Sequence, residues 1–156
     1  NNTPPRSPVV ELTATADART LSLYDQVDSV CMCSLNLGET SLIDTAIQRT
    51  GVSCTYRQWN APSSLLDTLP EVSCNVVVCH RLLHTLDDSG VDFVLDFAVE
   101  RLTPGGRLLW IEPDESGSTG AGMSARWKDA FPKAEVFCDA EEGLDLGVAI
   151  KPVKAG

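Results

Sequence analysis

The sequence predicts an α/β protein built on an open, twisted and mostly parallel sheet with helices on both faces. Short apolar segments alternate with amphipathic segments along the chain, which is the pattern of strands and helices in turn. The apolar segments are rich in Val, Leu and Cys without strict polar alternation, as is typical of strands covered on both faces. The links between segments are short, which favours right-handed crossovers within one sheet.

The strands are predicted from these short apolar segments. The first five alternate with helices and lie at Pro8–Ala14, Ser29–Leu35, Val52–Gln58, Cys74–His80 and Gly106–Glu112. Two more, Glu135–Cys138 and Leu146–Lys151, flank the acidic turn DAEEG and are expected to form an antiparallel pair.

The helices are predicted from apolar residues that recur every three or four positions. They lie at Asp17–Gln26, Glu39–Thr50, Ser63–Leu69, Ser89–Leu102 and Met123–Ala130. Ser89–Leu102 has the clearest pattern, and the TPGG that follows is expected to terminate it. The Gly- and Ser-rich segment Asp114–Gly122 is predicted to be a loop.

Length and composition indicate a single domain. The 156 residues divide into an extended arm, Asn1–Pro8, which holds three prolines, and one domain at 9–156. The first residue is Asn, and together with this arm it suggests a processed organellar subunit of a larger complex. We therefore expect an intracellular, reducing location, either the mitochondrial matrix or the cytoplasm.

The charge balance bears on the partners. The chain has 12 basic and 22 acidic residues and a net charge of −10, so nucleic acid is an unlikely partner and protein partners are expected. No apolar segment approaches the roughly 20 residues that span a bilayer, so no membrane association is expected. The six cysteines form no CxxC pair and lie mostly in apolar segments, which favours buried free thiols over a zinc or iron–sulfur site.

Two segments of the second half carry a family resemblance. NVVVCHRLLHTL, followed by a helix and then RLTPGGRLLWIEP, resembles class I S-adenosylmethionine (SAM)-dependent methyltransferases of the small-molecule type. The resemblance extends over roughly Val9–Lys151. It implies seven strands in the order 3-2-1-4-5-7-6, with an antiparallel last strand. In the PGG turn, Pro104 is expected to stop the helix, and Gly105 and Gly106 to permit positive φ.

The cofactor loop of that family is altered here. The family has an acidic residue and then GxGxG after the first strand; Glu11 keeps the acidic position, but Thr13, Thr15 and Asp17 stand in place of the glycines. Threonine resists positive φ and crowds a ligand, and Asp17 places a negative charge where the methionine carboxylate would lie. As a separate role, Asp17 is expected to cap the following helix.

The positions that resemble the family's adenosine contacts also differ. Ser34 stands where the family has an acid that holds the ribose, and Asn36 follows two residues later. Trp59 and Asn60 stand at the adenine side, where Asn60 is able to hydrogen-bond an adenine amine and Trp59 to stack on it. Asn75 replaces an Asp at the start of the fourth strand. Because these changes together remove most of the family's contacts, we expect that no cofactor is bound; SAM is the alternative.

Two further groups lie at the carboxyl edge of the sheet, where such folds bind ligands. His80 and His84, the only histidines, are expected to be a solvent-facing residue and a loop-packing residue, with a metal pair or a base as the alternative. Glu112 and Asp114 are expected at a solvated loop mouth, with a paired acid/base role as the alternative.

Three hypotheses for the function remain open. The first is a non-catalytic methyltransferase-like domain that serves as an accessory subunit, assembly factor or interaction scaffold; a minor variant resembles the N-terminal domain of anamorsin, an iron–sulfur assembly factor. The second is an active methyltransferase with an atypical pocket that uses Glu11, Asn36, Asn60 and His84. The third is a binder of another small ligand at the same edge.

Overall fold

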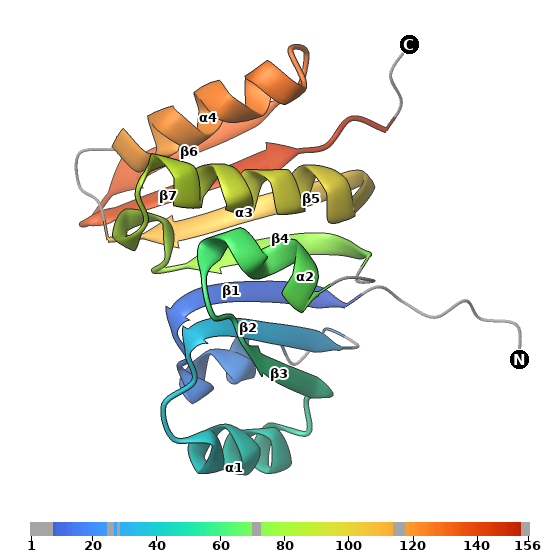
Figure 1. Cartoon of the computed structure of the whole chain (residues 1–156), viewed down its shortest axis with the longest axis vertical. Coiled ribbons are helices and arrows are strands. Elements are labelled where there is room, and N and C mark those ends of the chain that lie inside the picture. The colour runs from blue at the N-terminus through green and yellow to red at the C-terminus, as the bar shows by residue number, and fades with distance from the viewer. Residues whose placement is uncertain (1–7, 25–26, 28, 70–72, 114–117, 154–156) are drawn as a thin grey trace, which may run out of the picture.

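A computed structural model describes residues 8–24, 27, 29–69, 73–113 and 118–153 (Figure 1). Seven strands form one sheet in the order β3-β2-β1-β4-β5-β7-β6, which confirms the predicted order. The first five strands run parallel, β7 is antiparallel to β5, and β6 is antiparallel to β7. The strands are β1 (Val9–Thr15), β2 (Val30–Asn36), β3 (Cys54–Gln58), β4 (Cys74–His80), β5 (Leu102–Glu112), β6 (Val136–Glu141) and β7 (Leu144–Ile150).

The helices are close to the predicted ones, with three differences. The segment after β1 is a 3₁₀ helix over Ala18–Tyr24, and the last two residues of the predicted helix, 25 and 26, lie outside the described residues. Helix α4 begins at Ser118, inside the segment predicted as a loop, and the short 3₁₀ helix Leu83–Thr85 was not predicted. The α-helices are α1 (Thr40–Thr50), α2 (Leu65–Thr68), α3 (Asp88–Arg101) and α4 (Ser118–Ala130), and the 3₁₀ helices are η1 (Ala18–Tyr24), η2 (Pro62–Ser64) and η3 (Leu83–Thr85).

The TPGG segment is part of a strand. Helix α3 ends at Arg101 and β5 begins at Leu102, so the segment bends within the strand and the chain does not leave the sheet. Gly105 has the expected positive φ of 83°. Gly106 is needed for a different reason, because a Cβ there would lie 2.8 Å from the carbonyl oxygen of Thr103.

The closing hairpin is longer than predicted. Most of the acidic DAEEG segment belongs to β6, and only Glu142 and Gly143 form the turn. Both residues have positive φ, 53° and 78°, which is the backbone of a type I′ turn.

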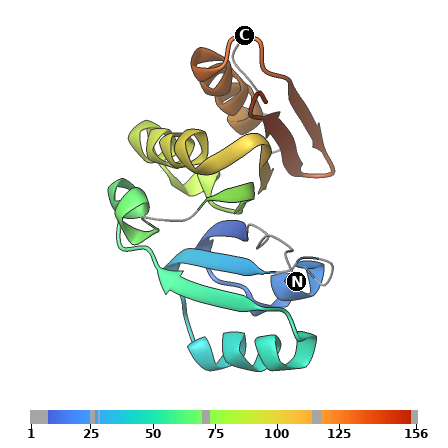
Figure 2. The ribbon, with the colours of Figure 1, turned by 90° about the vertical axis from the view of Figure 1, so that its right-hand side faces the viewer.

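The main core lies between the sheet and helices α2, α3 and α4 (Figures 1 and 2). Three tryptophans, Trp59, Trp110 and Trp127, are fully buried in it. Gly147 on β7 faces Trp110, and a Cβ at this position would lie 1.9 Å from the indole ring. The glycine is therefore a packing requirement of this layer.

On the opposite face, the helices that the structure describes cover one half of the sheet. Helices η1 and α1 pack there against β2, with Leu21, Met32 and Ile43 at the centre of a smaller core. Figure 2 shows α2, α3 and α4 on one side of the strands and η1 on the other, with no described helix over β5, β7 and β6 on that other side.

The predicted arm, Asn1–Pro8, lies outside the described residues except for Pro8. Within the described ranges, no helix is long and apolar enough to cross a membrane.

All six cysteines are free thiols, and burial raises the pKa of Cys33 and of Cys74 to about 12.

Candidate functional site

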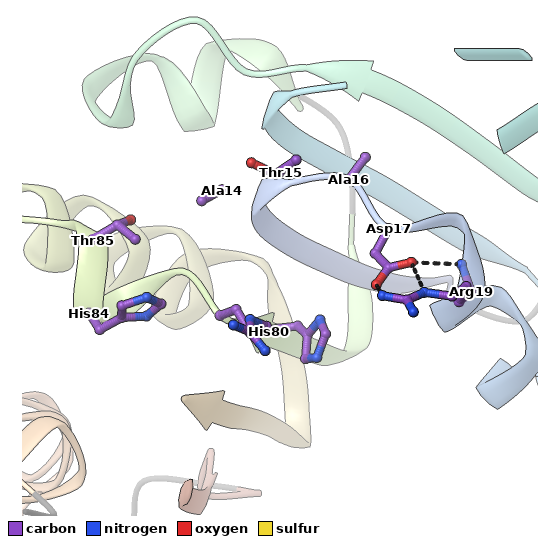
Figure 3. A pocket seen from close by; sticks show the side chains of 9 residues that line it. Ala14, Thr15, Ala16, Asp17, Arg19, His80, His84 and Thr85 are labelled. Carbon is purple, nitrogen blue, oxygen red and sulfur yellow. Dashed lines mark hydrogen bonds and ion pairs between the residues drawn. The ribbon is translucent and has the colours of Figure 1, made fainter. Parts of the chain in front are cut away.

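An open pocket of about 630 Å³ lies at the carboxyl edge of the sheet, where β1 and β4 end side by side (Figure 3). This is the edge at which sheets of this topology bind ligands. The pocket is lined by Ala14, Thr15, Ala16, Asp17, Arg19, His80, Arg81, His84 and Thr85.

The chain at the end of β1 stays extended where a ligand-binding loop would turn. Thr15 still pairs with Asn36 of β2, and the amide of Ala16 donates to the carbonyl oxygen of Asn36 at 2.8 Å. None of residues 13–17 has a positive φ. The turn therefore lacks the backbone conformation that glycines give to a phosphate or carboxylate cradle.

Thr13 and Ser34 bind each other inside the protein. Their hydroxyl oxygens are 2.5 Å apart, and the two side chains are 1% and 0% exposed. Thr13 is the first altered glycine position and Ser34 the altered ribose position. The two substitutions thus join β1 to β2 by a buried hydrogen bond, and neither residue lines the pocket.

Asp17 lies on the pocket wall and caps η1, as the sequence predicts. Its Oδ1 accepts from the backbone amide of Arg19 at 3.0 Å, and the Arg19 guanidinium bonds both carboxylate oxygens, at 3.0 and 2.9 Å (Figure 3). These hydrogen bonds hold the pKa of Asp17 below its usual value. Asp17 therefore stays negatively charged on the pocket wall. The helix that it caps, η1, has only seven residues and is too short to form an anion site at its start.

Glu11 lies beneath η1 and faces away from the pocket. It is 1% exposed, and its carboxylate accepts from Thr20 Oγ1 at 3.0 Å and from the hydroxyl of Tyr24. Burial raises the pKa of Glu11 above its usual value, and the two hydrogen bonds offset part of that shift. The retained acidic residue thus anchors η1 to the sheet.

Three of the residues predicted at the adenosine side, Asn36, Trp59 and Asn60, are not part of the pocket. The side chain of Asn36 accepts from the amide of Gly38 at 2.9 Å, and Asn60 is exposed after β3. Trp59 is fully buried in the main core, so its ring is not available to stack on adenine. Its indole N–H finds no acceptor among the described residues.

Glu112 is buried and joins β5 to the segment after β4. It is fully buried, and its carboxylate accepts from the amides of Leu82 and His84 at 3.0 and 2.9 Å and from the His84 ring nitrogen Nδ1 at 3.0 Å. The predicted solvated position of Glu112 is wrong, because three donors from one loop converge on it. Asp114, its predicted partner, lies outside the described residues.

Both histidines line the pocket, His80 from the end of β4 and His84 from η3. The ring of His84 points toward His80, and its side chain is 35% exposed (Figure 3). Arg19 and Arg81 also line the pocket, and sequence reasoning missed both. Their only signal was proximity to Asp17 and His80 along the chain. Within the described part of the chain, no three metal-binding side chains gather as ligands.

Solved structures share this architecture. The chain superposes on DhpI in its complex with SAH with a TM-score of 0.69, at 14% identity and over 96% of this chain and 78% of DhpI. The chain has the class I methyltransferase fold. Human methyltransferase 10 domain containing protein gives a TM-score of 0.67 at 8% identity, over 99% and 75% of the two chains. An rRNA methylase from Streptococcus thermophilus gives 0.60 at 11%, over 94% and 89%.

The likeness concerns the fold alone, because each of these identities is below one fifth. No protein-family profile matches the sequence. No curated protein sequence matches it either. The function must therefore be argued from the site of this chain.

Proposed function

We propose that this chain is a non-catalytic methyltransferase-like domain that has lost SAM binding and acts through protein contacts, as an accessory subunit, assembly factor or scaffold. The observation that carries the proposal is the turn after β1. There, β1 and β2 remain paired through Thr15 and Asn36, and Thr13 and Ser34 bond each other where the fold's ligand would need room and donors.

Charge and access support the same conclusion. Asp17 stays negatively charged on the pocket wall and is bonded to Arg19, so this position offers an incoming carboxylate an acceptor where the fold needs a donor. Two positions at the adenosine side offer no contact, because Trp59 packs in the core and Ser34 is buried. A hydrogen bond to a charged group contributes about 1.5–3 kcal/mol, so losing several removes a micromolar affinity.

Calorimetric titration with SAM tests the proposal. We expect no saturable heat from this chain, while DhpI, whose complex with SAH is known, serves as a positive control under the same conditions. Saturable heat with a micromolar dissociation constant would overturn the proposal.

An active methyltransferase with an atypical pocket is the second candidate, and the His84–Glu112 contact favours it. The buried carboxylate fixes the ring of His84 through Nδ1, which leaves Nε2 to accept a proton from a substrate in the open pocket. Of the residues first considered for this role, Glu11 lies beneath η1, outside the pocket.

Methyl transfer from radiolabelled SAM to candidate acceptors tests this second function. The variant His84→Gln keeps the bulk of the side chain and removes the base, so activity of the unmodified chain that falls at least about a hundredfold in the variant would support catalysis. Activity that does not change in His84→Gln would exclude His84 as the base.

A further inference from the structure

Half of one sheet face lacks a covering layer in the described part of the chain. Helices α3 and α4 pack on one face of β5 and β7, and on the other face the described helices η1 and α1 reach only the half of the sheet formed by β1, β2 and β3 (Figure 2). The surface in question is the outer face of β5, β7 and β6, which we call the bare face. Sheets of parallel α/β proteins are covered on both faces, so this surface is unusual for the fold.

The bare face is apolar and continuous across the strands. Side chains alternate along each strand, so those on the bare face follow from the ladder register: Leu109 of β5 pairs with Val148 of β7, which pairs with Phe137 of β6, and Ile111 pairs with Leu146 in the next row. Phe137 is 58% exposed, and the other four are partly exposed. None of these five belongs to either core of the protein.

The margin of this face on β6 is acidic. Asp139 lies two residues after Phe137 and shares its side of β6, and Glu135 directly precedes the strand; both are exposed. Arg107 lies at the opposite margin, on β5, where it pairs with Ile150. Since the chain carries a net charge of −10, two copies would repel one another, which disfavours a second copy as the occupant.

We propose that the bare face is the docking surface for an amphipathic helix of another protein, with an apolar side on Leu109, Val148 and Phe137 and basic residues toward Glu135 and Asp139. The three strands span roughly 10 Å, which fits one helix about 10 Å wide. Helices cover the rest of the sheet, so a helix is the element that completes the layer. The proposal rests on the proposed function, because it names the surface through which a non-catalytic domain would act.

A defined peptide tests the docking surface. The probe is a fluorescein-labelled, helix-forming peptide of about 18 residues with leucines on one side and lysines on the other, followed by fluorescence anisotropy at physiological salt. The control peptide has the same composition in a scrambled order. We expect saturable binding of the amphipathic peptide, at least about tenfold tighter than that of the scrambled one.

Variants locate the binding on the bare face. Phe137→Ser and the double change Glu135→Lys with Asp139→Lys are each expected to weaken binding at least about fivefold. Leu42→Ser is the matched control, because Leu42 is 60% exposed on α1, away from this face. Circular dichroism of each variant verifies that it is folded.

Several results would overturn the docking surface. One is equal affinity of the protein for the two peptides. Another is a loss of peptide affinity in Leu42→Ser as large as that in Phe137→Ser. A third is peptide binding that appears only after residues 1–7 are deleted, which would make those residues the occupant. Self-association in sedimentation velocity that is abolished by Phe137→Ser would instead assign the face to a second copy and overturn the helix. The peptide titration involves no SAM, so saturable SAM binding overturns the proposed function alone, and absent peptide binding overturns the docking surface alone.

Discussion

The hydrogen bond between Thr13 and Ser34 predicts a measurable coupling between two positions that the methyltransferase fold normally uses for its cofactor. Thr13→Val and Ser34→Ala each remove one hydroxyl and leave the other buried without its partner, since both side chains are at most 1% exposed. Each single substitution is expected to lower the free energy of unfolding by about 1–3 kcal/mol. The double variant leaves no buried hydroxyl unpaired, so its loss should be smaller than the sum of the single losses by about 1–2 kcal/mol.

Urea unfolding of the four proteins in this double-mutant cycle measures that coupling. For a chain of this length, each kcal/mol corresponds to a shift of about 2–4 °C in the melting temperature, so thermal unfolding provides a second reading. Strictly additive losses would refute the reasoning, because they would mean that the two hydroxyls do not depend on one another and that the carboxyl edge of β1 and β2 is not held by this bond.

Three further predictions concern the packing and the buried carboxylates. Gly147→Ala places a Cβ 1.9 Å from the ring of Trp110 and should cost about 1–3 kcal/mol or more in urea unfolding; an unchanged midpoint would contradict the close packing. Glu112→Ala removes the acceptor of two amides and of the His84 ring, and should cost about 3 kcal/mol, with a smaller loss in Glu112→Gln; equal losses would contradict the three-donor arrangement. Burial raises the pKa of Glu11 above its ordinary value of 4.5, so the stability that protonated Glu11 contributes is full below pH 4.5 and is lost as pH rises through the higher folded value. Glu11→Gln should therefore gain stability relative to the unmodified chain as pH rises above about 4.5; a difference that does not change with pH would contradict the raised pKa.

The arrangement of the sheet was predictable because its determinants are local and repeated. Apolar segments without polar alternation mark strands covered on both faces, and the alternation with helices fixes parallel crossovers. The strand boundaries that differ from the predicted ones, those of β5 and β6, involve residues whose role depends on the tertiary structure. Thr103 to Gly106 bend within β5, and Asp139 extends β6 because it pairs with Leu146 across the hairpin.

The candidate site was predictable in place but not in detail. Parallel strands end at one edge, so positions after β1 and β4 had to meet there, and the pocket lies at that point. The direction in which each side chain points was not predictable from the sequence. Glu11 and Thr13 face η1 and β2, and Glu112 is buried because donors from a distant loop converge on it. Contacts between residues far apart in the chain leave no pattern in a single sequence.

Calorimetric titration of this chain with SAM at millimolar concentration shows whether the turn after β1 still holds SAM. We expect no saturable heat, which corresponds to a dissociation constant above about 1 mM and a binding free energy weaker than about 4 kcal/mol. A saturable isotherm with a micromolar dissociation constant, weakened by a substitution in the pocket such as His80→Ala, would contradict it.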